Sequence, residues 1–74
     1  MKLTIKELRE THELTAEELG QLLGVSKQAV RAWETGIYKP RLEHWRAIEN
    51  EFGYEYKPEY VNGDWIHFFE KEDD

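Results

Sequence analysis

Apolar side chains recur at helical spacing in the first two thirds of the chain, in stretches that each begin with a residue suited to capping a helix. These first residues are Thr4, Thr15 and Ser26. A glutamate follows Thr4 and Thr15 at the third position, which is the spacing of a capping box. In that motif the hydroxyl and the carboxylate each accept a hydrogen bond from a backbone N–H of the first turn. The pattern predicts short helices near residues 5–11, 16–23 and 27–34.

Glycine and proline mark where these helices end and where a fourth begins. Gly24 and Gly36 follow the second and third stretches, and glycine readily adopts the left-handed conformation that ends a helix. Pro40 has a φ angle fixed near the helical value, and an apolar stripe follows it as far as Gly53. We therefore expect a fourth helix between these two residues, with a buried face made of Leu42, Trp45, Ile48 and Phe52.

The last part of the chain, residues 54–74, is rich in aromatic and β-branched residues. Asn62-Gly63 divides it, and Asn-Gly between two such runs predicts a hairpin turn. Pro58 lacks an N–H, so the first strand is expected to lie at an edge or to begin late. Because an isolated hairpin is only marginally stable in water, its aromatic residues must pack on the helices or on another chain. We expect residues 70–74 to form a frayed acidic tail.

The chain has 74 residues and no cysteine. This length allows one domain, and the lack of cysteine excludes disulfides and thiolate metal sites. No apolar run approaches the roughly 18 residues that span a membrane. We therefore expect a soluble, cytoplasmic protein.

Charge is distributed unevenly along the chain, whose formal net charge is −6. Residues 26–46 carry five basic and two acidic residues, whereas residues 47–74 carry two basic and nine acidic ones. A basic segment can bind phosphates locally even in an acidic molecule, although the overall repulsion weakens long-range attraction. The basic middle third is therefore the candidate for contact with nucleic acid.

The second and third predicted helices are joined by a turn of a few residues, from Leu23 to Ser26. Such a turn sets two helices at a steep angle and presents the second of them to the major groove of DNA. Gly20 lies where the two helices come closest, so a small residue is expected there. The residues spaced to pack the pair together are Leu19, Leu23, Val25, Val30 and Trp33.

Residues 14–36, with the proline and the apolar stripe that follow, resemble the XRE or Cro/CI family of helix-turn-helix regulators. The combination of Gly24-Val-Ser26 with Trp33-Glu-Thr-Gly36 carries the resemblance, which runs from Lys2 to Gly53. It implies a mainly α fold, with a four-helix, Cro/repressor-like helix-turn-helix domain at residues 1–53. The aromatic β-hairpin and acidic tail, residues 54–74, follow as a second part that packs on the same domain or on a partner.

The resemblance also implies that the third helix contacts base edges and that its neighbours hold phosphates. Lys27, Gln28, Arg31 and Ala32 match the base-reading positions. Lysine and arginine can bind guanine O6 and N7, glutamine can bridge adenine N6 and N7, and alanine offers a methyl contact. The alternative is that these residues form an ordinary solvated helix face. The residues implied to contact phosphates are Ser26, Lys39, Arg41 and Arg46.

Other implied roles are structural. In the family, a glutamate at the position of Glu34 forms a buried ion pair with an arginine of the first helix, and Arg9 occupies the matching place. Such a pair fixes the placement of helices more surely than it adds stability. The chain departs from the family where Ala16, in place of the usual glutamine, is followed by Glu17 and Glu18. Because carboxylates near DNA cost affinity, we expect weak binding or binding as a dimer.

No pattern of catalytic residues accompanies these motifs. The sequence has no glycine-rich phosphate loop and no Ser/His/Asp arrangement, and His12, His44 and His67 lack the spacing of metal ligands. We therefore expect neither an enzyme nor a protein that binds a metal, a cofactor or a small-molecule substrate.

These observations predict a DNA-binding transcription regulator of a phage or prophage-type genetic switch, with double-stranded operator DNA as its partner and a homodimer as the binding form. The alternative is an antirepressor or modulator that binds a cognate repressor through an acidic, aromatic surface. In a plainer interpretation, these aromatics complete the protein's own core or a homodimer interface. The predicted partner or dimer surface consists of Tyr56, Tyr60, Trp65, Phe68 and Phe69.

Overall fold

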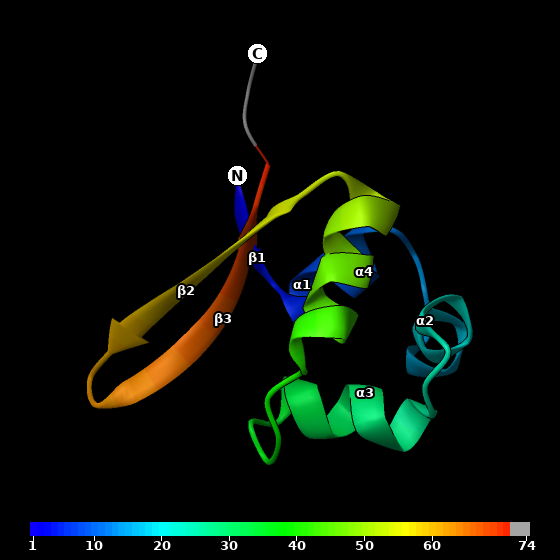
Figure 1. Ribbon diagram of the computed structural model, residues 1–74, viewed down its shortest axis with the longest axis horizontal. Coiled ribbons are helices and arrows are strands. Elements are labelled where there is room, and N and C mark those ends of the chain that lie inside the picture. The colour runs from blue at the N-terminus through cyan, green and yellow to red at the C-terminus, as the bar shows by residue number, and fades with distance from the viewer. Residues whose placement is uncertain (72–74) are drawn as a thin grey trace.

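The chain forms four helices and a three-stranded sheet within residues 1–71, the part described by the computed structural model (Figure 1). The helices are α1 (Ile5–Thr11), α2 (Ala16–Leu23), α3 (Lys27–Glu34) and α4 (Leu42–Phe52). The strands are β1 (Lys2–Thr4), β2 (Glu55–Val61) and β3 (Asp64–Glu70). The predicted fold class, four helices followed by a β-hairpin, is confirmed. None of the helices in this part of the chain is long and apolar enough to cross a membrane.

Side-chain caps define where the first three helices begin. Thr4 Oγ1 accepts a hydrogen bond from Glu7 N at 3.2 Å, and Glu7 Oε1 accepts one from Thr4 N at 2.9 Å. Thr15 and Glu18 repeat this capping box at the start of α2. The hydrogen bonds from the Thr15 backbone and hydroxyl groups lower the pKa of Glu18, because they favour its charged form. Ser26 Oγ accepts from Ala29 N at 3.1 Å and caps α3.

The fourth helix begins later than the position of Pro40 suggested. Its N-cap is Arg41, which makes no side-chain capping hydrogen bond, and its first helical residue is Leu42. Pro40 is buried before the helix, where its fixed φ angle turns the chain toward α4 without belonging to it.

The N-terminus joins the hairpin in one antiparallel sheet, in the order β1-β3-β2. We did not expect β1, in which Lys2 pairs with Glu70 and Leu3 pairs with Phe69. The predicted frayed tail is wrong at its first two residues, because Glu70 ends β3 and Lys71 N donates to the Met1 carbonyl at 3.0 Å. The rest of that tail, residues 72–74, lies outside the described residues. The hairpin turn is confirmed: Asn62 and Gly63 have φ angles of 49° and 88°, as a two-residue turn of type I′ requires.

The free edge of β2 is blocked against further strand pairing. Tyr56 N, near the start of this strand, donates a hydrogen bond to Glu49 Oε2 of α4 at 2.8 Å. Pro58, in the middle of the strand, has no N–H to donate, and its predicted place at an edge is confirmed. An edge with few free donors resists pairing with another chain.

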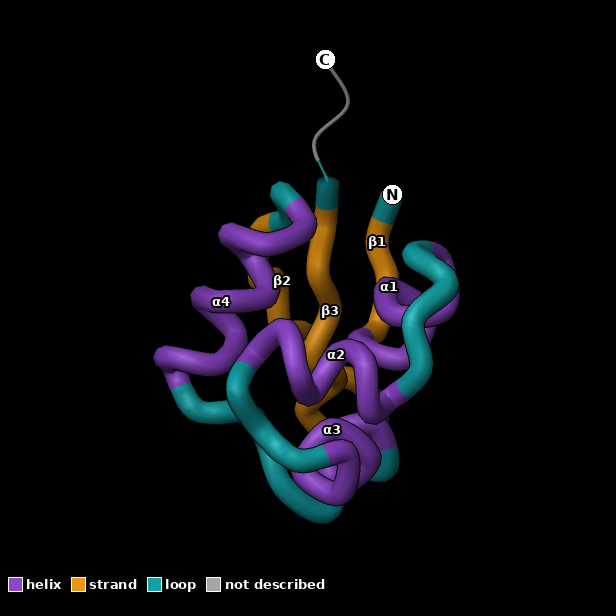
Figure 2. The backbone as a smooth tube through the Cα atoms, turned by 90° about the vertical axis from the view of Figure 1, so that its right-hand side faces the viewer, coloured by secondary structure: helices purple, strands orange, loops and turns teal. Residues whose placement is uncertain are grey.

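The core lies between the helices and one face of the sheet, as Figure 2 shows. β3 contributes Phe69, which has no exposed surface, and the chain just before β2 contributes Tyr54. Phe69 was expected on a partner surface, and this prediction is wrong because pairing with β1 and β2 places its side chain against the helices. The other buried core residues are Ile5, Leu8, Ala16, Leu19, Val30, Trp33 and Ile48.

An ion pair connects α1 to the end of α3. Arg9 Nε donates to Glu34 Oε2 at 2.7 Å, and Arg9 Nη2 donates to Glu34 Oε1 at 3.1 Å. Arg9 Nη1 also donates to the carbonyl of Leu14, which ties in the segment between α1 and α2. The side chains of Arg9 and Glu34 are 15% and 8% exposed. The hydrogen bond to Glu34 raises the pKa of Arg9, so the guanidinium stays charged.

Gly20 lies at the closest approach of α2 and α3. A Cβ atom at this position would come within 2.6 Å of the Val25 carbonyl oxygen and 3.2 Å of the Ser26 carbonyl carbon. Both neighbours are backbone atoms of the turn, so they cannot rotate away. The expected small residue is therefore required by the geometry of the helix pair.

Gly20→Ala is expected to destabilise the protein by about 1–3 kcal/mol, although alanine is normally the better helix former. The added methyl group must push α3 away from α2. Chemical denaturation would measure the change, and Gln21→Ala, on the exposed face of the same helix, is the matched control. A stabilised Gly20→Ala variant would contradict the close approach.

Arg9→Met is expected to cost about 3–5 kcal/mol, because it leaves the Glu34 carboxylate buried without a partner. The double variant Arg9→Met/Glu34→Leu removes both charges and should recover most of this loss. Unfolding free energies of the two single variants and the double variant form a mutant cycle. A loss below about 1 kcal/mol in Arg9→Met would mean that the pair behaves like an exposed one.

Candidate nucleic-acid interface

The turn between α2 and α3 is built from local backbone geometry. Gly24 ends α2 with a φ angle of 73°, and Val25 N donates to the carbonyl of Gly20 at 2.8 Å. Val30 and Trp33 then anchor one face of α3 in the core. Figure 1 shows the result: α3 runs across the lower end of α4, and its outer face has no other element over it.

Three of the four predicted base-reading residues lie on this outer face. Lys27, Gln28 and Arg31 are exposed, whereas Ala32 is half-buried. The carbonyl of Ala32 accepts hydrogen bonds from Ile37 N and Tyr38 N, which fold the following loop against the end of α3.

Thr35 shares the exposed face, although sequence reasoning did not single it out. It is the C-cap of α3, and its hydroxyl donates to the carbonyl of Arg31 at 2.9 Å. Its position could have been predicted from the spacing, because residues four apart, such as Arg31 and Thr35, lie on the same side of a helix.

The predicted phosphate contacts lie just before α3, between α3 and α4, and on α4. Ser26, Lys39, Arg41 and Arg46 are all exposed. The Ser26 oxygen accepts the capping hydrogen bond, which leaves its hydroxyl proton free to donate outward. Lys39 and Arg41 lie on the segment between α3 and α4, and Arg46 lies on α4.

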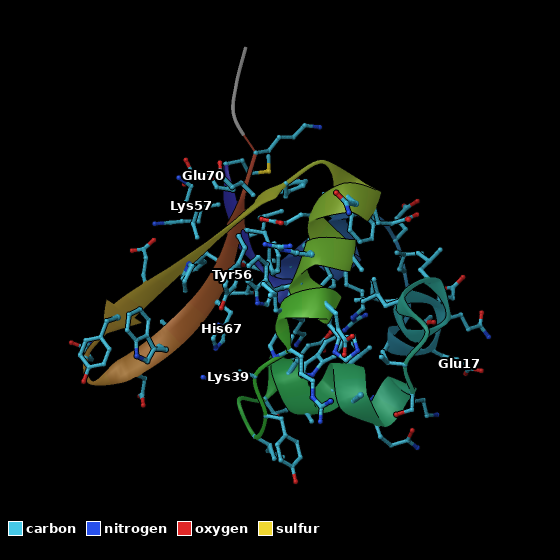
Figure 3. The ribbon with its side chains drawn as sticks, in the orientation of Figure 1. Glu17, Lys39, Tyr56, Lys57, His67 and Glu70 are labelled. Carbon is cyan, nitrogen blue, oxygen red and sulfur yellow. The ribbon has the colours of Figure 1, made fainter. Side chains whose placement is uncertain are left out.

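An acidic residue lies beside the start of α3. Glu17, which Figure 3 shows on α2, lines a groove of about 340 Å³. Ser26, Lys27 and Gln28 line the same groove. The departure from the family pattern therefore places a carboxylate next to three predicted DNA contacts. A carboxylate at this position would repel a DNA phosphate.

The predicted partner surface is divided by the sheet. Tyr56 is half-buried, with its ring stacked 4.4 Å from that of Trp45. Phe68 is half-buried beneath the ammonium group of Lys2, which lies 4.9 Å from the ring centre. Tyr60 and Trp65, at the hairpin tip, are each 62% exposed and contact each other edge to face. Of the five predicted residues, these two are the exposed ones.

Tyr56 of β2 and His67 of β3 form a polar contact with each other. The Tyr56 hydroxyl and His67 Nδ1 are 2.5 Å apart. Burial raises the pKa of Tyr56 and lowers the pKa of His67, and the positive charge of Lys39 lowers the pKa of His67 further. Within residues 1–71, no three His, Asp or Glu side chains come together as a possible metal site.

Comparison with known proteins agrees with this geometry. The chain is 43% identical over 53 residues to an uncharacterised HTH-type transcriptional regulator of Methanocaldococcus jannaschii, which covers 72% of this chain and 80% of that protein. No solved structure matches the chain significantly. The model of the helix-turn-helix family matches residues 5–57, which include α1 to α4. The protein therefore belongs to the XRE-type helix-turn-helix family.

Proposed function

We propose that the protein is a DNA-binding transcription regulator that inserts α3 into the major groove of an operator. One observation carries this proposal: the exposed face of α3 presents Lys27, Gln28 and Arg31 without an exposed carboxylate. The acidic residue of this helix, Glu34, is nearly buried and is held by Arg9. The transcriptional-regulator description of the archaeal relative supports the same function.

The charge distribution is compatible with such a role despite the net charge of −6. DNA affinity depends on the charges that come within a few ångströms of phosphates, since salt screens more distant ones. We propose that Ser26, Lys39, Arg41 and Arg46 contact the phosphates beside the groove. The distant carboxylates then reduce the rate of encounter more than they weaken the complex.

The proposal extends to a phage or prophage-type genetic switch, which the likeness to Cro-type regulators implies. Two copies on two half-sites would add the affinity that one short helix lacks. A cytoplasmic location follows from the same function.

A second candidate function is binding to a cognate repressor protein. The exposed pair of Tyr60 and Trp65 favours it, because large aromatic side chains commonly anchor protein interfaces. Their strand neighbours Glu59 and Asp64 lie on the opposite face of the hairpin, where Glu59 pairs with Lys2, so the aromatic pair by itself supports this alternative.

Arg31→Ala is expected to weaken binding to a preferred duplex by about 1–3 kcal/mol if the side chain contacts a base. The duplex would be selected from a random library, and affinity would be measured by fluorescence anisotropy. Lys57→Ala removes the same charge from the hairpin, where Lys57 lies near Glu55, and should change affinity little. No affinity for any duplex at low ionic strength would contradict the proposal and favour the protein-binding alternative.

Glu17→Gln is expected to raise affinity for every duplex about threefold to tenfold, because it removes a carboxylate beside the first residues of α3. Glu51→Gln, at the exposed end of α4, makes the same change in net charge and is the matched control. An equal gain in both variants would show that total charge, not the position of Glu17, limits binding.

A further inference from the structure

A stack of rings connects α4 to both hairpin strands and ends at His67. Trp45 of α4 stacks on Tyr56 of β2, and Tyr56 stacks on His67 of β3 with ring centres 5.8 Å apart and planes 9° apart. The half-buried His67 also lines a groove of about 280 Å³ between β3, the start of α1 and the end of α3. The imidazole is therefore held by Tyr56 and borders a groove that also contains the end of α3.

The charged and titratable groups around His67 come from four segments. β2 contributes the Tyr56 hydroxyl, and the segment between α3 and α4 contributes Lys39, which Figure 3 shows next to His67. α1 contributes Lys6 to the groove, and α3 contributes Glu34, whose charge is neutralised by Arg9. α4 contributes an uncharged ring to the stack, that of Trp45. The net environment of His67 is positive.

Protonation of His67 does not require its contact with Tyr56 to break. The neutral ring can accept a hydrogen bond from the Tyr56 hydroxyl at Nδ1, and a protonated ring can donate to the same oxygen. Two factors oppose protonation of His67: burial and the charge of Lys39, which lower its pKa from the ordinary value of 6.5. A phosphate bound at Lys39 would cancel the second factor and attract the imidazolium.

We propose that His67 is a proton-linked phosphate contact, which takes up a proton when the Lys39 segment binds the DNA backbone, so that DNA affinity rises as the pH falls. This inference rests on the proposed function, because it assumes that DNA phosphates approach Lys39.

The sign of the effect follows from linkage. If the bound state has the higher pKa at His67, complex formation takes up protons at pH values between the two pKa values. One histidine takes up at most one proton, so affinity rises at most about tenfold per pH unit. The window begins below 6.5, the ordinary value for histidine, because the pKa of His67 is lowered in the free protein.

The test compares the wild type, His67→Gln and His12→Gln on one generic mixed-sequence duplex, from about pH 8 to about pH 5.5 at constant low ionic strength. His12 packs on Phe52 and Tyr54, away from Lys39, and serves as the control. Fluorescence anisotropy should give the wild type and His12→Gln an affinity gain about fivefold larger than that of His67→Gln. Glutamine keeps a polar group near Tyr56, and thermal unfolding at each pH would verify that every variant is folded.

An NMR titration of the imidazole protons supplies the direct measurement. The pKa of His67 should rise when the duplex is added, and it should also rise in free Lys39→Gln, which needs no DNA. Equal pH dependence in all three proteins, with an unchanged pKa at His67, would overturn this inference and leave the proposed function intact. No duplex binding at any pH would overturn both.

Discussion

Arg9 crosses from α1 to the end of α3, where its guanidinium binds both carboxylate oxygens of Glu34 and the carbonyl of Leu14. Three segments are thereby fixed relative to one another. The same pair turns the carboxylate of α3 inward, which leaves the outer face of this helix without an exposed acid. The placement of α3 and the electrostatics of its outer face thus depend on one nearly buried ion pair, whose cost is the desolvation of two charges.

The sheet supports the helices from the opposite side and joins the two ends of the chain. β1 pairs with β3, so that Phe69 can enter the core beside Ile5 and Leu8. Tyr56 and Trp45 stack across the junction of sheet and helix. Glu49, a half-buried residue of α4, accepts the hydrogen bond from Tyr56 N. The backbone N–H of Tyr56, at the outer edge of β2, thus has a partner within the protein, and this protects the edge from pairing with another chain.

An acidic protein can still present a local surface for an anion, because fields at a binding face are dominated by the nearest charges. Here five basic residues lie on α3 and on the segments that follow it, and most of the carboxylates lie on other parts of the chain. Two exposed carboxylates lie nearer: Glu17 at the groove beside Lys27, and Glu43 in the first turn of α4. Nearby groups also dominate at His67, where partial burial and the charge of Lys39 lower the pKa of the imidazole.

The helix starts and the hairpin turn follow from the sequence alone, because they depend on residues that are neighbours along the chain. Thr4, Thr15 and Ser26 define helix starts through bonds to groups three residues away, and Asn62-Gly63 defines the hairpin turn through its positive φ angles. The strand at residues 2–4 could not be predicted, because three residues are too few to show a periodic pattern. Its hydrogen-bond partners come from β3, near the other end of the chain. The burial of Phe69 and the exposure of Trp65, two residues of the same strand, also follow from the tertiary structure. The helices cover the part of β3 that contains Phe69 and leave Trp65, near the hairpin tip, uncovered.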